Sequence, residues 1–309
     1  MSVWLYLPLL VSVVLALVAP WAGHRMPPRT GVWTMVCAAL VAAGTWATEL
    51  AIVAFTAVGQ IPFIAAQGPW SVRALEADDP VSREVAGICA GVVLCVVVSV
   101  TVASWRRCRA LVDAWRGCRK LTVAGDLAVV DDPQPAAFAV AGLPGRVVVS
   151  SGMLRLLDAR ERRALLAHER AHLRYRHHLF LLVLHLAAAV NPLLRRVERA
   201  GAFAVERWAD EAAGAAVADR GVVARAVARS ALAASRSRRG ALAATAGPVP
   251  RRVQALLAPQ IPLRTAELAA FAALVAACCV SLALAAHQTE LLFEAAMRAH
   301  AAGLHVRVR

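Results

Sequence analysis

Hydrophobic residues gather in four long runs, and each run is long enough to form a membrane-spanning helix. The runs cover residues 3–19, 32–58, 85–104 and 268–286. About 20 apolar residues cross the hydrocarbon core of a bilayer, so the pattern predicts four transmembrane helices. The first run has no basic residue ahead of it and is followed by Trp21 rather than a small-residue cleavage site. It therefore predicts a retained anchor and not a removed signal peptide.

A fifth apolar run, residues 179–190, is too short to span. It predicts either a core helix or a helix lying at the membrane interface. Glu49 lies inside the second run or at its outer edge. A carboxylate inside a span is costly and often functional, whereas an interfacial one is not, and the span boundary leaves both positions open.

The distribution of charge predicts the orientation. Residues 105–264 carry 27 basic and 12 acidic side chains, whereas the rest of the chain carries 7 and 8. Because basic residues near spans stay on the cytoplasmic side, this long loop is predicted to be cytosolic. The first short loop is also basic and the second, around residues 73–84, is net acidic. Both chain ends are then predicted to lie outside.

Composition agrees with a membrane protein. Hydrophobic residues make up 60% of the 309 residues and the mean hydropathy is +0.60, which excludes a disordered chain. The net charge of +14 is explained by attraction to anionic lipid, because no basic helix interleaved with aromatic residues indicates direct nucleic-acid binding. The seven cysteines include no C-x-x-C pair, so neither a disulfide framework nor a thiolate zinc site is predicted.

Within the long loop, a basic helix over residues 105–120 is expected to continue out of the third span. The short apolar runs 127–130, 137–141 and 147–150 flank turn residues and predict a small sheet with a hairpin at residues 142–145. Asp158 and Glu161 have the spacing of a capping box and predict a helix that runs to about Arg176.

That helix carries the pattern H-E-x-x-H at His168, Glu169 and His172. Two histidines four residues apart share one helical face and can bind one Zn²⁺, while the glutamate between them reaches the activated water. At about 100° per residue, these residues lie opposite the arginine face of the helix. The alternative is two ordinary histidines on an amphipathic helix.

A catalytic zinc site needs a third protein ligand. Glu206 lies 34 residues after His172 on a second helical stretch, and Asp210, one turn later, could orient a ligand histidine. Glu211 points elsewhere. From spacing alone, an ordinary solvated Glu/Asp pair remains open. His177 and His178 would fall on the arginine face if the helix continued, so they are predicted to be surface residues.

Four motifs together resemble the BlaR/MecR-type antirepressor metallopeptidases and, more distantly, the HtpX-type membrane gluzincins. They are residues 147–153, the H-E-x-x-H motif after Ala167, the sequence Asn191-Pro192-Leu193, and residues 206–211. The resemblance covers about residues 1–290. It implies one Zn²⁺ held by His168, His172 and Glu206, with Glu169 as the catalytic base and Asp210 as the partner of a ligand.

The fold that follows is a mainly α membrane protein with four transmembrane helices. A cytosolic α+β gluzincin zinc peptidase domain is inserted between spans three and four. The expected parts are a three-helix membrane region (1–104), the peptidase domain (105–265), the fourth span (266–287) and a short outer tail (288–309). No S-x-x-K motif is present, so the resemblance does not extend to direct β-lactam sensing.

The expected function is zinc-dependent endopeptidase activity at a bacterial plasma membrane, with a cytosolic regulator such as a transcriptional repressor as substrate. A substrate strand could add to the edge of the sheet near residues 147–150. Two alternatives remain: a quality-control protease that uses the same site, and a non-catalytic receptor in which zinc only stabilises the domain. The expected partners are a peptide or protein substrate and the lipid bilayer. The sequence indicates no oligomeric state.

Overall fold

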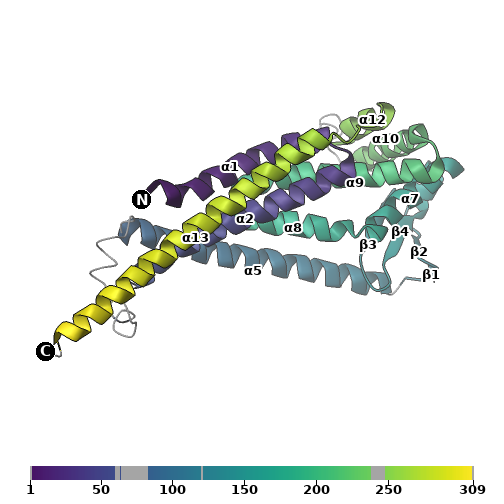
Figure 1. Ribbon diagram of the computed structural model, residues 1–309. Coiled ribbons are helices and arrows are strands. Elements are labelled where there is room, and N and C mark those ends of the chain that lie inside the picture. Colours follow the sequence, from purple (N-terminus) through teal and green to yellow (C-terminus); the bar gives the residue numbers. More distant parts are fainter. Residues whose placement is uncertain (1, 60–62, 64–82, 120, 238–247, 308–309) are drawn as a thin grey trace.

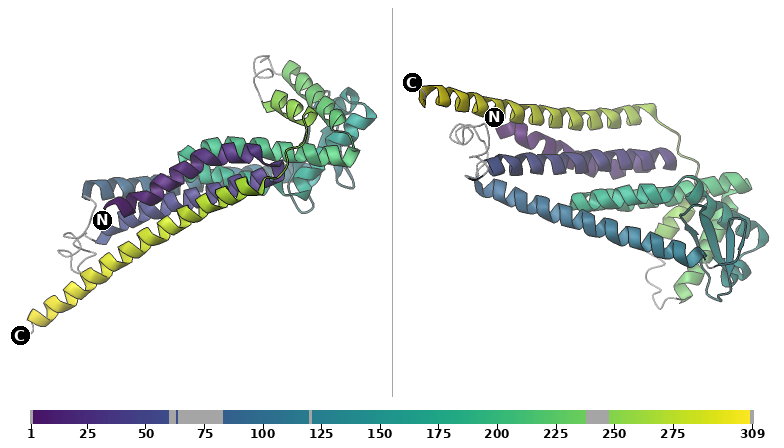
Figure 2. Two further views of the ribbon diagram at one scale, coloured as in Figure 1. Left: turned by 45° about the horizontal axis from the view of Figure 1, so that its top comes forward. Right: turned by 90° about the horizontal axis from the view of Figure 1, so that it is seen from below.

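The computed structural model describes residues 2–59, 63, 83–119, 121–237 and 248–307. Four of its helices are long and apolar enough to cross a membrane, as predicted. They are α1 (Ser2–Arg25), α2 (Pro28–Gly59), α5 (Arg83–Arg119) and α13 (Thr265–Arg307). The helices form an elongated bundle with both chain ends at one end and the small sheet at the other (Figures 1 and 2).

The two later helices extend well beyond their apolar runs. Helix α5 continues without a break into the basic segment, as predicted. Helix α13 continues to Arg307, through most of the segment expected to form an outer tail (288–309). The physical reason is that residues 287–302 contain no Gly or Pro and are rich in Ala, Leu and Glu, which favour helix. The acidic second loop lies mostly in residues 64–82, outside the described residues.

Small residues allow the helices of the bundle to pack closely. Buried alanines from α1 and α2 form much of its core, together with Leu15, Val32 and Met35. At the start of α2, a Cβ on Gly31 would lie 2.4 Å from the carbonyl oxygen of Gly23. Only glycine therefore permits this approach of the two helices.

The short apolar run forms α8 (His177–Val190), which packs against α2, α5 and the following helix α9 (Arg195–Val217). A 3₁₀ turn, η1 (Pro192–Leu194), joins the two helices. Leu184 and Val197 belong to the same buried cluster as Leu15 and Val32 of the bundle. The core-helix alternative for this run is therefore supported. Because these residues form a single buried cluster, the bundle and the α8–α9 pair share one apolar core.

The sheet has four strands in the order β1-β2-β4-β3. The strands are β1 (Val123–Ala124), β2 (Leu127–Val130), β3 (Ala137–Val140) and β4 (Arg146–Ser150). Strands β3 and β4 form the predicted antiparallel hairpin, and β2 pairs with β4 in parallel. Strand β4 is therefore central and almost wholly buried. The expectation of a free edge near residues 147–150 is wrong, because β3 and β2 occupy both sides of β4.

The remaining helices surround the sheet and the candidate site. They are α6 (Ser151–Leu156), α7 (Ala159–Arg174), α10 (Arg220–Ser237) and α12 (Pro248–Leu257). The predicted capping box at the start of α7 is present: Asp158 accepts from the backbone N–H of Glu161, and Glu161 accepts from that of Asp158. Helix α7 ends at Arg174, since Arg176 has a left-handed backbone with φ of 53°. The seven cysteines are free thiols.

Candidate active site

Helices α7 and α9 lie side by side and bring three predicted ligands together. The Nε2 atoms of His168 and His172 are 3.1 Å apart. The Glu206 carboxylate lies 3.5 Å from Nε2 of His168 and 3.6 Å from Nε2 of His172. The 34-residue gap between His172 and Glu206 is spanned by the α8–η1–α9 hairpin, which returns the chain to the same level.

These separations fit a tetrahedral zinc centre. Zinc–nitrogen and zinc–oxygen bonds of about 2.0–2.2 Å in a tetrahedron place neighbouring ligand atoms roughly 3.3–3.5 Å apart. Two ring nitrogens and a carboxylate that face one another at these distances also require a shared cation or proton. Side chains of other described residues do not close the fourth side, because Glu206 remains about one-third exposed beside a cavity. The residues present therefore fit one Zn²⁺ with an open position.

Asp210 lies where the sequence predicted it. Its side chain is buried, and Oδ1 is 3.0 Å from Nδ1 of His168, on the ring edge opposite the candidate metal-binding nitrogen. Glu211 points away and bonds instead to Arg220 and Gln260. These two adjacent carboxylates therefore have different partners.

Arg252 was not predicted from the sequence. It reaches the site from α12 and donates to both oxygens of Asp210, at 2.8 and 2.6 Å. Its Nη1 also lies 2.8 Å from Oε2 of Glu206. One guanidinium therefore holds the two carboxylates of α9 in place. Nothing in the sequence distinguishes Arg252 from its neighbour Arg251, apart from its position on the apolar side of a short helix.

The prediction that His177 is a surface residue is wrong. The side chain is fully buried, and its Nδ1 lies 3.0 Å from Nδ1 of His172. The helical count failed because α7 ends before this residue and the left-handed Arg176 redirects the chain. His178 is half-buried and lines a cavity beside Glu169, so it also does not lie on the arginine face.

Comparison with known proteins adds a family to this geometry. Residues 119–191 match the model of peptidase family M48. The match supports a metallopeptidase and includes the sheet, α6, α7 and α8, but it ends before Glu206. Comparisons with curated proteins and with solved structures gave no match.

The electrostatics of the cluster formed by His168, His172 and Glu206 favour cation binding. Burial alone would lower the pKa of His168, but the nearby carboxylates of Asp210 and Glu206 outweigh it and raise the pKa to about 9. Burial lowers the pKa of His172 to about 4, so this ring is neutral near pH 7. Burial opposes ionisation of Glu206, yet His168 and Arg252 lower its pKa to about 2. The cluster thus combines an ionised carboxylate with a neutral imidazole.

Glu169 is buried next to this cluster, and burial raises its pKa above the usual value. It lines two cavities, one of about 470 Å³ shared with His168 and Arg252 and one of about 340 Å³ shared with His172. Phe138 of β3 also lines both cavities. The outer edge of the sheet therefore runs past the carboxylate of Glu169.

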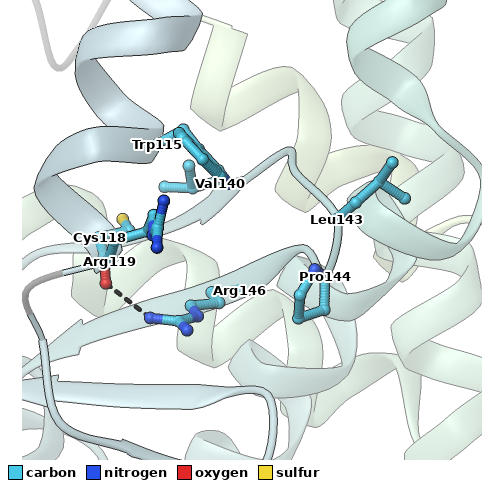
Figure 3. A pocket seen from close by; sticks show the side chains of 7 residues that line it. All are labelled: Trp115, Cys118, Arg119, Val140, Leu143, Pro144 and Arg146. Carbon is cyan, nitrogen blue, oxygen red and sulfur yellow. Dashed lines mark hydrogen bonds between the residues drawn. The ribbon is translucent and has the colours of Figure 1, made fainter.

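A third cavity, of about 320 Å³, lies further along the same hairpin (Figure 3). Here Arg146 donates to the carbonyl oxygen of Cys118, in the last turn of α5, at 2.7 Å. A Cβ on Gly142 would lie 2.7 Å from the ring of Trp115, so the turn packs directly on α5. Helix α5 therefore connects its long apolar segment to the hairpin that contains β3.

Proposed function

We propose that the protein is a membrane-anchored zinc endopeptidase. The observation that carries this proposal is the convergence of His168, His172 and Glu206 beside the buried carboxylate of Glu169. In this assignment the two histidines and Glu206 hold one Zn²⁺, and Glu169 is the catalytic base. Asp210 orients His168, and Arg252 keeps Asp210 and Glu206 in position.

Zinc, when bound, supplies a Lewis acid that polarises the scissile carbonyl and makes water more acidic. The carboxylate of Glu169 accepts the proton from the attacking water and then delivers it to the leaving amine nitrogen. Its raised pKa suits both steps, because a base whose pKa lies closer to the working pH can also act as an acid. Burial next to the ligands keeps the carboxylate at one position.

Substrate peptides are proposed to add to β3 and not to β4. The carbonyl oxygen of Ala136 accepts from the backbone N–H of Ser150, and the N–H of Ala136 donates to Oγ of Ser150. Because paired residues alternate along an antiparallel ladder, the backbone groups of Ala137 and Ala139 face the outer edge of β3, where the Ala139 backbone is also a hydrogen-bond partner of the Glu169 carboxylate. An extended peptide bound there would lie next to Glu169.

The wider role is proposed from the layout. We propose that the domain between spans three and four lies in the cytosol of a bacterium, which its basic charge favours, and that both chain ends lie outside. A regulated protease that cleaves a transcriptional repressor or another regulator is favoured, because α5 is continuous from its apolar segment to the β3–β4 hairpin. A quality-control protease would use the same site. A non-catalytic zinc-stabilised receptor is the third candidate.

The decisive experiment compares wild type with Glu169→Gln in membranes and as purified protein. The variant is expected to retain one zinc ion but to lose activity by a factor of about 10²–10⁴. Glu290→Gln, which changes an exposed carboxylate on α13, is the matched control and is expected to be fully active. Proteomics of cells that carry each form would identify the proteins that lose cleavage products. If Glu169→Gln kept full function in cells, the enzyme proposal would be wrong.

A further inference from the structure

The two candidate zinc histidines have different partners on the side away from the metal. The Nδ1 of His168 faces the carboxylate of Asp210, whereas Nδ1 of His172 faces Nδ1 of His177 at 3.0 Å. Ligand histidines commonly donate this second N–H to a carboxylate, a backbone carbonyl or water. An imidazole in this role is unusual and requires a defined arrangement of protons.

Only one arrangement of protons lets Nε2 of His172 bind the metal while Nδ1 of His172 and Nδ1 of His177 share a hydrogen bond. If Nε2 of His172 binds the metal, its ring proton must lie on Nδ1, which then donates. The Nδ1 of His177 must therefore accept, so the proton of His177 lies on its own Nε2. The His177 ring is fully buried, and its Nδ1 faces Nδ1 of His172 at hydrogen-bond distance.

The surroundings of His177 hold its ring in this orientation. The ring centroid lies 5.8 Å from that of Tyr175, in a stacked arrangement, and 4.7 Å from that of Trp208. Its Nε2 has no hydrogen-bond partner in the described part of the chain. An N–H beside an aromatic face makes a weak but favourable contact, so the indole of Trp208 suits this proton.

We propose that His177 is a positioning residue for His172, which accepts the Nδ1–H of that ring and fixes the tautomer that leaves Nε2 free for zinc. This inference rests on the proposed zinc site. It assigns to α8 the role that Asp210 has on α9: each ligand histidine is oriented by one buried side chain from a neighbouring helix.

The test measures zinc affinity of the full-length protein in detergent, by competition with a chromophoric chelator. His177→Phe and His177→Leu remove the acceptor with and without a ring and are expected to weaken zinc binding about 10–100-fold. His177→Asn places an amide oxygen near the position of Nδ1 and is expected to bind zinc within a few-fold of wild type. His185→Phe, two turns later on α8 and paired with Glu198, is the control and is expected to match wild type.

A second measurement reads geometry directly. The visible absorption spectrum of the Co²⁺ form is expected to change in His177→Phe and His177→Leu but not in His177→Asn. The proposal is overturned if the Phe or Leu variant folds and binds Zn²⁺ like wild type, or if Asn is as weak as Phe. If only one of His177→Phe and His177→Leu folds, that variant alone is enough to test the proposal. If wild type bound no zinc, the proposed function itself would fail, which is a distinguishable result.

Discussion

Two buried carboxylates, one at the candidate active site and one in the helix bundle, differ in whether they have a charged partner. Asp210 and Glu49 are each about 1% exposed. Both oxygens of Asp210 accept from Arg252, and one also faces His168. The oxygens of Glu49 have no hydrogen-bond partner among the described residues, and its helix packs on α1 and α13. Burial is equal, but only one carboxylate has a counter-charge.

This contrast indicates where in the molecule a buried carboxylate has a cationic partner that stabilises its charge. Burying an ionised group without a partner costs far more than a protein of marginal stability can offset. Near the candidate site, Arg252 neutralises the buried carboxylate of Asp210, so this carboxylate stays ionised and can orient His168. In the bundle, Glu49 has no such partner among the described residues. The following variants test this difference.

The largest effect is expected from Arg252→Met, since it removes the guanidinium from buried Asp210 and leaves that carboxylate with His168 as its one remaining charged partner among the described residues. Removing one partner of a buried pair costs about 3–5 kcal/mol of the free energy of unfolding. The thermal unfolding midpoint of metal-free protein should therefore fall by several degrees. Arg251→Met is the matched control: Arg251 is exposed and its guanidinium lies 4.7 Å from the ring centroid of Phe203, a contact worth about 0.5–1 kcal/mol.

A double variant separates charge from packing. When Asp210→Asn is added to Arg252→Met, the uncompensated charge disappears, so part of the lost stability should return. The two changes must then be non-additive, as expected for residues in contact. A double variant no more stable than Arg252→Met alone would contradict the view that the guanidinium acts by neutralising Asp210.

A smaller loss is expected from Arg229→Met. Arg229 of α10 lies 2.6 Å from Oε2 of Glu161, whose side chain is 2% exposed. Glu161 also accepts from the backbone N–H of Asp158 and therefore keeps one hydrogen bond. Leaving a buried acceptor partly unsatisfied costs about 1–3 kcal/mol. Arg225→Met, an exposed arginine on the same helix, should leave the unfolding midpoint unchanged. If Arg229→Met and Arg225→Met had equal unfolding midpoints, the ion pair between Arg229 and Glu161 would not contribute to stability.

The sequence was most informative where a single segment determines the structure. A run of about 20 apolar residues favours a helix long enough to cross a bilayer whatever surrounds it, so all four long helices were predictable. The capping box of Asp158 and Glu161 and the spacing of His168 and His172 are likewise local. Glu206 could be proposed because its motif lies on one helix. In each case the informative residues lie within a single helix.

Features that depend on how elements meet were missed or wrong. His177 was misplaced because one left-handed residue, Arg176, ended the helical periodicity. Strand β4 was taken as an edge because strand order is set by tertiary pairing and not by the strand's own residues. Arg252 had no local signal, since its role depends on α12 folding back over α9. Of these, His177 and Arg252 contact the predicted ligands and complete the candidate site.

The smallest effect is expected at Glu49, where the same chemical change should have the opposite sign from Asp210. Glu49→Leu removes a buried carboxyl that has no described partner, so the unfolding midpoint should stay unchanged or rise, by the equivalent of about 1 kcal/mol. Asp210→Leu removes one of the two carboxylates that pair with Arg252 and should lower the midpoint strongly. Measuring both variants side by side in one detergent compares the two regions directly. If Glu49→Leu were as destabilising as Asp210→Leu, Glu49 would also have to be a paired, ionised group, and the contrast between catalytic region and bundle would not hold.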